Sequence, residues 1–175
     1  RRGVLAVLMV VALLVGVFAV VPSVGATPAA AAPTTQMVIC LDASNSIDSA
    51  TWGFMTTGVA NAIRTVVPHD GSVELGVNKF GWTDDGMGDA AVVVPMQVIS
   101  SDAVANAVAV VVAAESKTAG WTPTGKAIEL ASAMMQGSTN WQFATRHIIN
   151  VVTDGQPAQA GDPGYEAAKA AAVAA

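Results

Sequence analysis

The stretch MVICLDASNS (residues 37–46) joins five apolar residues to a cluster of short polar side chains. The apolar part, 37–41, is typical of a strand buried on both faces, because a continuous run of this length leaves no polar face. Asp42, Ser44 and Ser46 follow at the point where this strand is expected to end. In a chain that is 53% hydrophobic and only 12% charged, such a cluster indicates either a helix cap or a binding site.

Apolar runs alternate with helical patterns along the rest of the chain. We expect strands at 37–41, 73–80, 91–99 and 147–152, and helices at 49–67, 102–115, 124–136 and from Asp162 onward. Buried strands that alternate with helices predict a doubly wound α/β fold, in which a mostly parallel sheet has helices on both faces. Pro95 has no N–H to donate, so the 91–99 strand is expected to return through a hairpin as an antiparallel edge strand.

The N-terminus has the features of an export signal. Two arginines precede a long apolar run and several small residues, so we expect residues 1–26 to be a signal peptide. An uncleaved membrane anchor is the alternative, because the run is long enough to span a bilayer. The Ala/Pro/Thr-rich residues 27–36 are predicted to be a linker, and the domain is expected at 37–175. The protein is therefore expected to be secreted, periplasmic or displayed at the cell surface.

Charge and cysteine content limit the partners and the chemistry. The formal net charge is -5, which argues against nucleic acid because that partner needs clustered basic residues. Cys40 is the only cysteine, so the chain forms no internal disulfide, and its position in an apolar run predicts a small core residue.

Three loops that are distant in the sequence are expected to meet at one edge of the sheet. Loops that follow parallel strands lie at the carboxyl edge, where ligands bind in doubly wound folds. The side chains that these loops bring there are Asp42, Ser44, Ser46, Thr122 and Asp154. They are hard oxygen donors without histidine or thiolate, a set that suits Mg²⁺, or else Mn²⁺ or Ca²⁺. The sequence therefore predicts a divalent-cation site with room for water and one oxygen from a ligand.

The same residues resemble the motifs of von Willebrand factor type A (VWA) domains. DASNS (42–46) is similar to the Asp-x-Ser-x-Ser motif, TPTG (122–125) to the threonine loop, and VVTDG (151–155) to the second aspartate motif, in the same order. The resemblance covers residues 37–175 and implies a Rossmann-like VWA fold of the secreted bacterial type. It also implies that the domain is incomplete at its C-terminus. Trp121 departs from the pattern, since a glycine is common at that place.

The resemblance implies a metal-ion-dependent adhesion site (MIDAS). Its direct ligands would be the three hydroxyl side chains Ser44, Ser46 and Thr122. Asp42 and Asp154 would act directly or through water, and a carboxylate from the partner would complete the coordination. Thr122 is chosen over Thr124, because Thr124 is expected to cap the following helix.

Two further groups of side chains have alternative interpretations. Asp84, Asp85 and Asp89 could form a calcium-like site or simply an Asp/Gly-rich turn. Trp121 and Trp82 could form an aromatic rim that binds the partner, or could close the edge of the sheet.

Three functions remain open. The favoured one is a non-enzymatic, cation-dependent adhesion module that captures an acidic group of a protein or matrix partner. The second is a scaffold in which the ion only stabilises loops. The third is a metal-dependent hydrolase, but an aspartyl-nucleophile phosphatase would need an aspartate where Ser44 stands. His69 and His147 have no nucleophile partner in a recognisable arrangement, so both are expected to be structural.

Overall fold

The computed structural model describes residues 31–82, 89–155 and 165–174. Over these residues the elements follow in the order β1 (Thr35–Asp42), α1 (Ser49–Thr65), β2 (Val73–Trp82), β3 (Asp89–Val98), α2 (Asp102–Ala113), α3 (Thr124–Gln136), β4 (Arg146–Val152) and α4 (Tyr165–Ala174). The predicted signal peptide, 1–26, lies outside the described residues. Within the described ranges no helix has both the length and the apolar character needed to cross a membrane.

The four described strands form one mixed sheet in the order β3-β2-β1-β4. β1 lies in the centre and pairs in parallel with both β2 and β4. β3 pairs antiparallel with β2 at one edge and contains Pro95. The predicted mostly parallel sheet with one antiparallel edge strand is confirmed.

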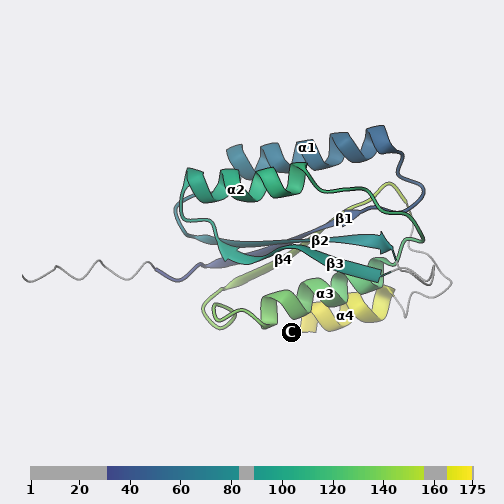
Figure 1. Ribbon diagram of the computed structural model, residues 1–175. Helices are drawn as coiled ribbons and strands as arrows, with labels where there is room; N and C mark the ends of the chain where they lie inside the picture. Colours follow the sequence, from purple (N-terminus) through teal and green to yellow (C-terminus); the bar gives the residue numbers. More distant parts are fainter. Residues whose placement is uncertain (1–30, 83–88, 156–164, 175) are drawn as a thin grey trace, which may run out of the picture.

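Helices cover both faces of the sheet, with α1 and α2 on one side and α3 and α4 on the other (Figure 1). Successive residues of β1 point to opposite faces: Ile39 and Leu41 lie in the core below α1 and α2, whereas Val38 and Cys40 pack against α3. The predicted doubly wound α/β architecture is therefore confirmed. Burial raises the pKa of the Cys40 thiol to about 12, as befits a core residue.

The domain begins earlier than predicted, because β1 starts at Thr35, inside the expected 27–36 linker. Gln36 is fully buried, and its Nε2 donates to Glu74 Oε2 at 2.7 Å. Ser138 Oγ and Asn140 Nδ2 also donate to the Glu74 carboxylate, at 2.8 and 3.0 Å from Oε1. Buried polar groups are tolerated when they are hydrogen-bonded, and these contacts explain why a polar residue continues the central strand.

Candidate metal centre

The loop after β1 is built around the buried carboxylate of Asp42. Its Oδ1 accepts a hydrogen bond from the backbone N–H of Ser44 at 2.9 Å, which closes a tight turn at the strand end. Ser44 is buried like Asp42, whereas Ser46 is exposed. The two serine hydroxyls share a hydrogen bond of 3.0 Å. The turn thus places the side-chain oxygens of Asp42, Ser44 and Ser46 one after another, from the core to the surface.

Asp154 reaches the same loop from β4. Ser46 Oγ donates to Asp154 Oδ1 at 3.0 Å, although the two residues are 108 positions apart in the chain. β1 and β4 are parallel neighbours, so their carboxyl ends lie at the same edge of the sheet. The structure therefore brings Asp42, Ser44, Ser46 and Asp154 together, as the sequence predicted.

Thr153 is a member of this cluster that the sequence analysis missed. Its Oγ1 donates to Asp42 Oδ2 at 2.6 Å and accepts from the Gly155 N–H at 3.1 Å. Both oxygens of Asp42 are thus hydrogen-bonded. One feature of the sequence could have indicated this role: Thr153 lies directly between the predicted strand and Asp154.

The loop between α2 and α3 brings Thr122 to this edge. The backbone N–H of Asn45 donates to Gly120 O at 3.0 Å, which joins the two loops. Thr122 and Ser46 line one open cavity of about 300 Å³, together with Asn45, Gly120 and Trp121. All five predicted site residues therefore lie at one edge of the sheet.

The prediction that Thr124 caps the following helix is wrong. Thr124 is the first residue of α3, Pro123 occupies the N-cap position, and no side-chain hydrogen bond caps this helix. The alternative role of residues 42–46 as a cap is also wrong. Asp48 caps α1 by accepting from the Thr51 N–H at 2.7 Å.

The start of the loop that carries Thr122 is tied to the body of the domain. Lys79 Nζ lies 2.5 Å from Glu115 Oε1 in a largely buried ion pair and 3.2 Å from Ser116 O. Trp52 Nε1 donates to Glu115 O at 2.9 Å. These contacts connect β2 and α1 to the start of the loop.

Gly81 lets the end of β2 approach the loop after β1 that carries Ser44 and Ser46, called the serine loop below. A Cβ at this position would lie 2.6 Å from Ser44 N and 2.8 Å from Ala43 C, which are backbone atoms. Its φ of 134° is also a conformation that residues with a side chain rarely adopt. Only glycine fits here without displacing the backbone of the serine loop.

The donor chemistry of the cluster fits a hard divalent cation. Neither aspartate takes part in any of the salt bridges found among the described residues, so no cationic side chain neutralises them there. That part of the chain also contains no cluster of three His, Cys, Asp or Glu side chains. Any ion at this edge would therefore depend on hydroxyl oxygens and on water, in addition to two carboxylates.

The remaining predicted residues have separate places. The side chain of Trp121 is 54% exposed at the wall of the cavity, whereas that of Trp82 lies outside the described part, as do Asp84 and Asp85. Asp89 Oδ1 accepts from the N–H of its neighbour Ala90 at 2.8 Å.

Both histidines make contacts away from this edge. His69 Nδ1 lies 2.6 Å from Asp102 Oδ1, and its Nε2 lies 2.8 Å from Ile63 O. The hydrogen bond to Asp102 is the main reason that the His69 pKa is raised. The ring of His147 packs on Trp141, with the ring centroids 3.9 Å apart.

Comparison with known proteins gives a family and a fold. The model of a family described as "Protein of unknown function (DUF1194)" matches residues 32–175. No curated protein matches the sequence.

Similar solved structures include a mussel byssus protein and two pilus proteins. Proximal thread matrix protein 1 from the mussel byssus is 16% identical, with a TM-score of 0.59, over 82% of this chain and 36% of that one. The pilus adhesin SpaC from Lactobacillus rhamnosus GG is 19% identical, with a TM-score of 0.55, over 71% of this chain and 16% of that one. The vWF domain of the pilus tip protein Mfa5 from Porphyromonas gingivalis is 16% identical, with a TM-score of 0.51, over 74% of this chain and 40% of that one.

These likenesses show a VWA-like fold. The chain spans less than half of the length of each of these three structures.

Proposed function

Because the chain belongs to the DUF1194 family and has a VWA-like fold, we propose that it is an adhesion-type binding module. In this proposal the module is exported and non-enzymatic, and it captures an acidic group of a protein or matrix partner. A divalent cation of the MIDAS type, Mg²⁺ or else Mn²⁺ or Ca²⁺, links the module to that group.

One observation carries the proposal: Ser44, Ser46 and Asp154 form a continuous chain of hydrogen bonds beside an open cavity. Ser44, Ser46 and Thr122 would hold the ion directly, and Asp42 and Asp154 would hold it directly or through water. When bound, the ion would supply the positive charge that attracts a carboxylate of the partner. The net charge of -5 gives the protein little other attraction for an acidic group.

The surroundings of the cavity support a protein partner. Trp121 is half exposed at its wall, and tryptophan is enriched among the residues that dominate binding energy at interfaces. Two of the similar structures are those of a pilus adhesin and a pilus tip protein, which supports a role at the cell surface.

A structural scaffold is the second candidate. The hydrogen bond between Ser46 and Asp154 joins the loops after β1 and β4, which favours a role in holding these loops together. A hydrolase has less support, because position 44 is a serine where an aspartyl-nucleophile phosphatase would need an aspartate.

The test is a calorimetric titration of the chain with Mg²⁺ and with Mn²⁺. We expect saturable binding that is lost in Asp42→Ala and Ser44→Ala and kept in the control Thr57→Ala, which removes an exposed hydroxyl on α1. A chain that binds neither ion, or variants that bind as well as the unmodified chain, would overturn the proposed site.

A second titration separates the two candidate functions. An acidic, glutamate-rich peptide is titrated into the chain with Mg²⁺ and again with a chelator. The adhesion proposal expects binding that the chelator abolishes. Ion binding that raises the melting temperature without any peptide binding would favour the scaffold.

A further inference from the structure

Glu74 is a buried carboxylate whose hydrogen-bond partners are all neutral. It is the second residue of β2, only 3% of its surface is exposed, and it takes part in none of the salt bridges found among the described residues. The groups that donate to it are Gln36 Nε2, Ser138 Oγ and Asn140 Nδ2. Glutamate is almost never buried to this extent unless its charge is paired. In the described part of the chain the charge of Glu74 has no compensating partner.

Two neighbouring features add to the attraction for a cation. Gln36 Oε1 is buried and accepts no hydrogen bond from the described residues, although the nitrogen of the same amide contacts Glu74. That nitrogen also lies 3.4 Å from Met135 O, in the last turn of α3. The C-terminal end of a helix is electronegative, and this turn has no basic residue. The carboxylate, the amide oxygen and the helix end all favour a positively charged donor.

Glu74 lines an open cavity of about 390 Å³ between β3 and the C-terminal end of α3. No basic side chain, and no residue of β4 or α4, is among the described residues that line it. Most of the other lining side chains are apolar: Val92, Pro95 and Met96 of β3, and Ala133 and Met134 of α3. Ligand-binding cavities typically combine apolar walls with a few polar groups that orient the ligand. This cavity has that composition, with one buried carboxylate.

A β-bulge opposite Gly76 shapes the wall of the cavity. The register between β2 and β3 is shifted around Gly76, so that two residues of β3, Pro95 and Met96, stand opposite it. Bulges change the direction of side chains and are frequent next to functional sites. Met96 Sδ and Met134 Cε lie only 2.7 Å from the place that a Cβ of Gly76 would occupy. Methionine side chains are flexible and adapt to irregular spaces, so this wall can adjust to an inserted side chain.

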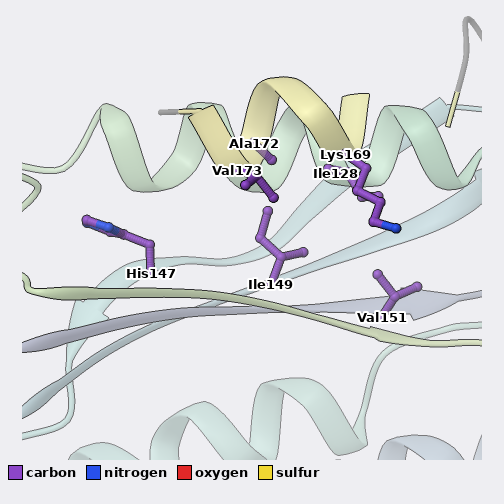
Figure 2. A pocket seen from close by; sticks show the side chains of 7 residues that line it. All are labelled: Ile128, His147, Ile149, Val151, Lys169, Ala172 and Val173. Carbon is purple, nitrogen blue, oxygen red and sulfur yellow. The ribbon is translucent and has the colours of Figure 1, made fainter. Parts of the chain in front are cut away.

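A larger cavity, between β4 and α4, has the opposite character. Its volume is about 490 Å³, and its described lining residues include Lys169 but no acidic side chain (Figure 2). An apolar ligand has no reason to prefer the smaller cavity, whereas a cation is attracted only to the one that contains Glu74. The charge of the ligand therefore decides between the two cavities.

We propose that the cavity at Glu74 binds a lysine side chain of a partner protein. The ammonium group, with three N–H donors and no acceptor, contacts Glu74, and the four-carbon stem packs between Met96 and Met134. Arginine suits the site less well, because its planar fork needs both oxygens of a carboxylate, and both oxygens of Glu74 already accept hydrogen bonds. The net charge of -5 also favours a basic partner.

This site is separate from the proposed ion site. In the parallel register of β1 and β2, Gln36 pairs with Glu74 at one end and Asp42 with Phe80 at the other. The two sites thus lie at opposite edges of the sheet, and lysine binding needs no divalent cation. A titration in the presence of a chelator therefore tests this site whether or not the ion site exists.

Nuclear magnetic resonance of the full chain, labelled at the methionine methyl groups, tests the proposal. The probe is the blocked peptide acetyl-Gly-Lys-Gly-amide, which has no carboxylate, and it is titrated with a chelator present. The matched control peptide has norleucine, which keeps the four-carbon stem without the ammonium group, in place of lysine. We expect the lysine peptide to shift the signals of Met96 and Met134 saturably, and to leave that of Met55, which packs on the other face of the sheet, unchanged.

Two variants locate the binding. Glu74→Gln should weaken binding of the lysine peptide about tenfold or more, because a hydrogen bond to a charged group is worth at least this factor. Ala133→Leu fills the cavity from an exposed position on α3 and should also weaken binding, whereas Ala107→Leu, at an exposed position on α2, should not. The Ala133→Leu result decides if Glu74→Gln fails to fold, which circular dichroism shows.

Four results would overturn the proposal. The first is the absence of any shift with the lysine peptide, and the second is equal binding of the norleucine peptide, which would show a merely apolar cavity. The third is binding that Ala133→Leu leaves unchanged, because the peptide would then lie elsewhere. The fourth is tighter binding of the corresponding arginine peptide, which would contradict the assignment to lysine.

Discussion

Replacement of Thr153 by valine should destabilise the domain through the buried carboxylate of Asp42. Valine has nearly the same shape but no hydroxyl, so it removes the donor that lies 2.6 Å from Asp42 Oδ2. Asp42 is fully buried, so its carboxylate depends on hydrogen-bond donors from the protein. A hydrogen bond to a charged group contributes about 1.5 to 3 kcal/mol, and we expect the free energy of unfolding to fall by about this amount.

Urea denaturation in the presence of a chelator measures this effect without a contribution from bound ions. With a slope of about 1 to 3 kcal/mol per molar urea, the midpoint should fall by roughly 1 M. Thr153→Ser is the control, because it keeps the hydroxyl and should retain most of the stability. A Thr153→Val chain within about 0.5 kcal/mol of the unmodified chain, the range of an ordinary surface substitution, would refute the reasoning.

Three further predictions concern other parts of the domain. The pKa of His69 is raised in the folded chain, because its ring is hydrogen-bonded to Asp102. The ion pair therefore contributes its full stability below the pKa of an unfolded histidine, about 6.5. This stability is lost as the pH rises through the pKa of the folded state. Melting temperatures across this range should show the loss, and Asp102→Asn should flatten it. Cys40 should resist alkylation at neutral pH until the chain is unfolded, as mass spectrometry of labelled samples can show. Gly81→Ala should weaken Mg²⁺ binding in calorimetry because its Cβ meets backbone, whereas Gly76→Ala should bind normally, since its near contacts are the flexible ends of two methionines.

The sequence was sufficient to predict the grouping at the carboxyl edge. Buried apolar strands imply parallel pairing, and parallel strands that neighbour each other end at the same edge. Asp42 and Asp154 each follow such a strand, so their proximity follows from topology alone. Side-chain roles that depend on one atom could not be predicted in this way: Thr153 matters because the second oxygen of Asp42 is buried and needs a donor.

The register between neighbouring strands could also not be predicted from the sequence. Gln36 was predicted to be a linker residue because it ends an Ala/Pro/Thr-rich stretch that has no pattern able to bury a face. The structure pairs it with Glu74 on the neighbouring strand, and only this alignment makes its burial favourable. The conformation of Gly81 depends in the same way on how closely the end of β2 approaches the loop after β1.

The central position of β1 has a consequence for the order in which the molecule folds. β1 is near the start of the domain, yet one of its two neighbours is β4, and the contact between Asp42 and Thr153 spans 111 residues. Contacts between such distant segments form slowly, because a long loop must close before they contribute any stability. We therefore expect the edge that carries Asp42 and Asp154 to be among the last parts to assemble during synthesis, so that ion binding there would report a fully folded chain.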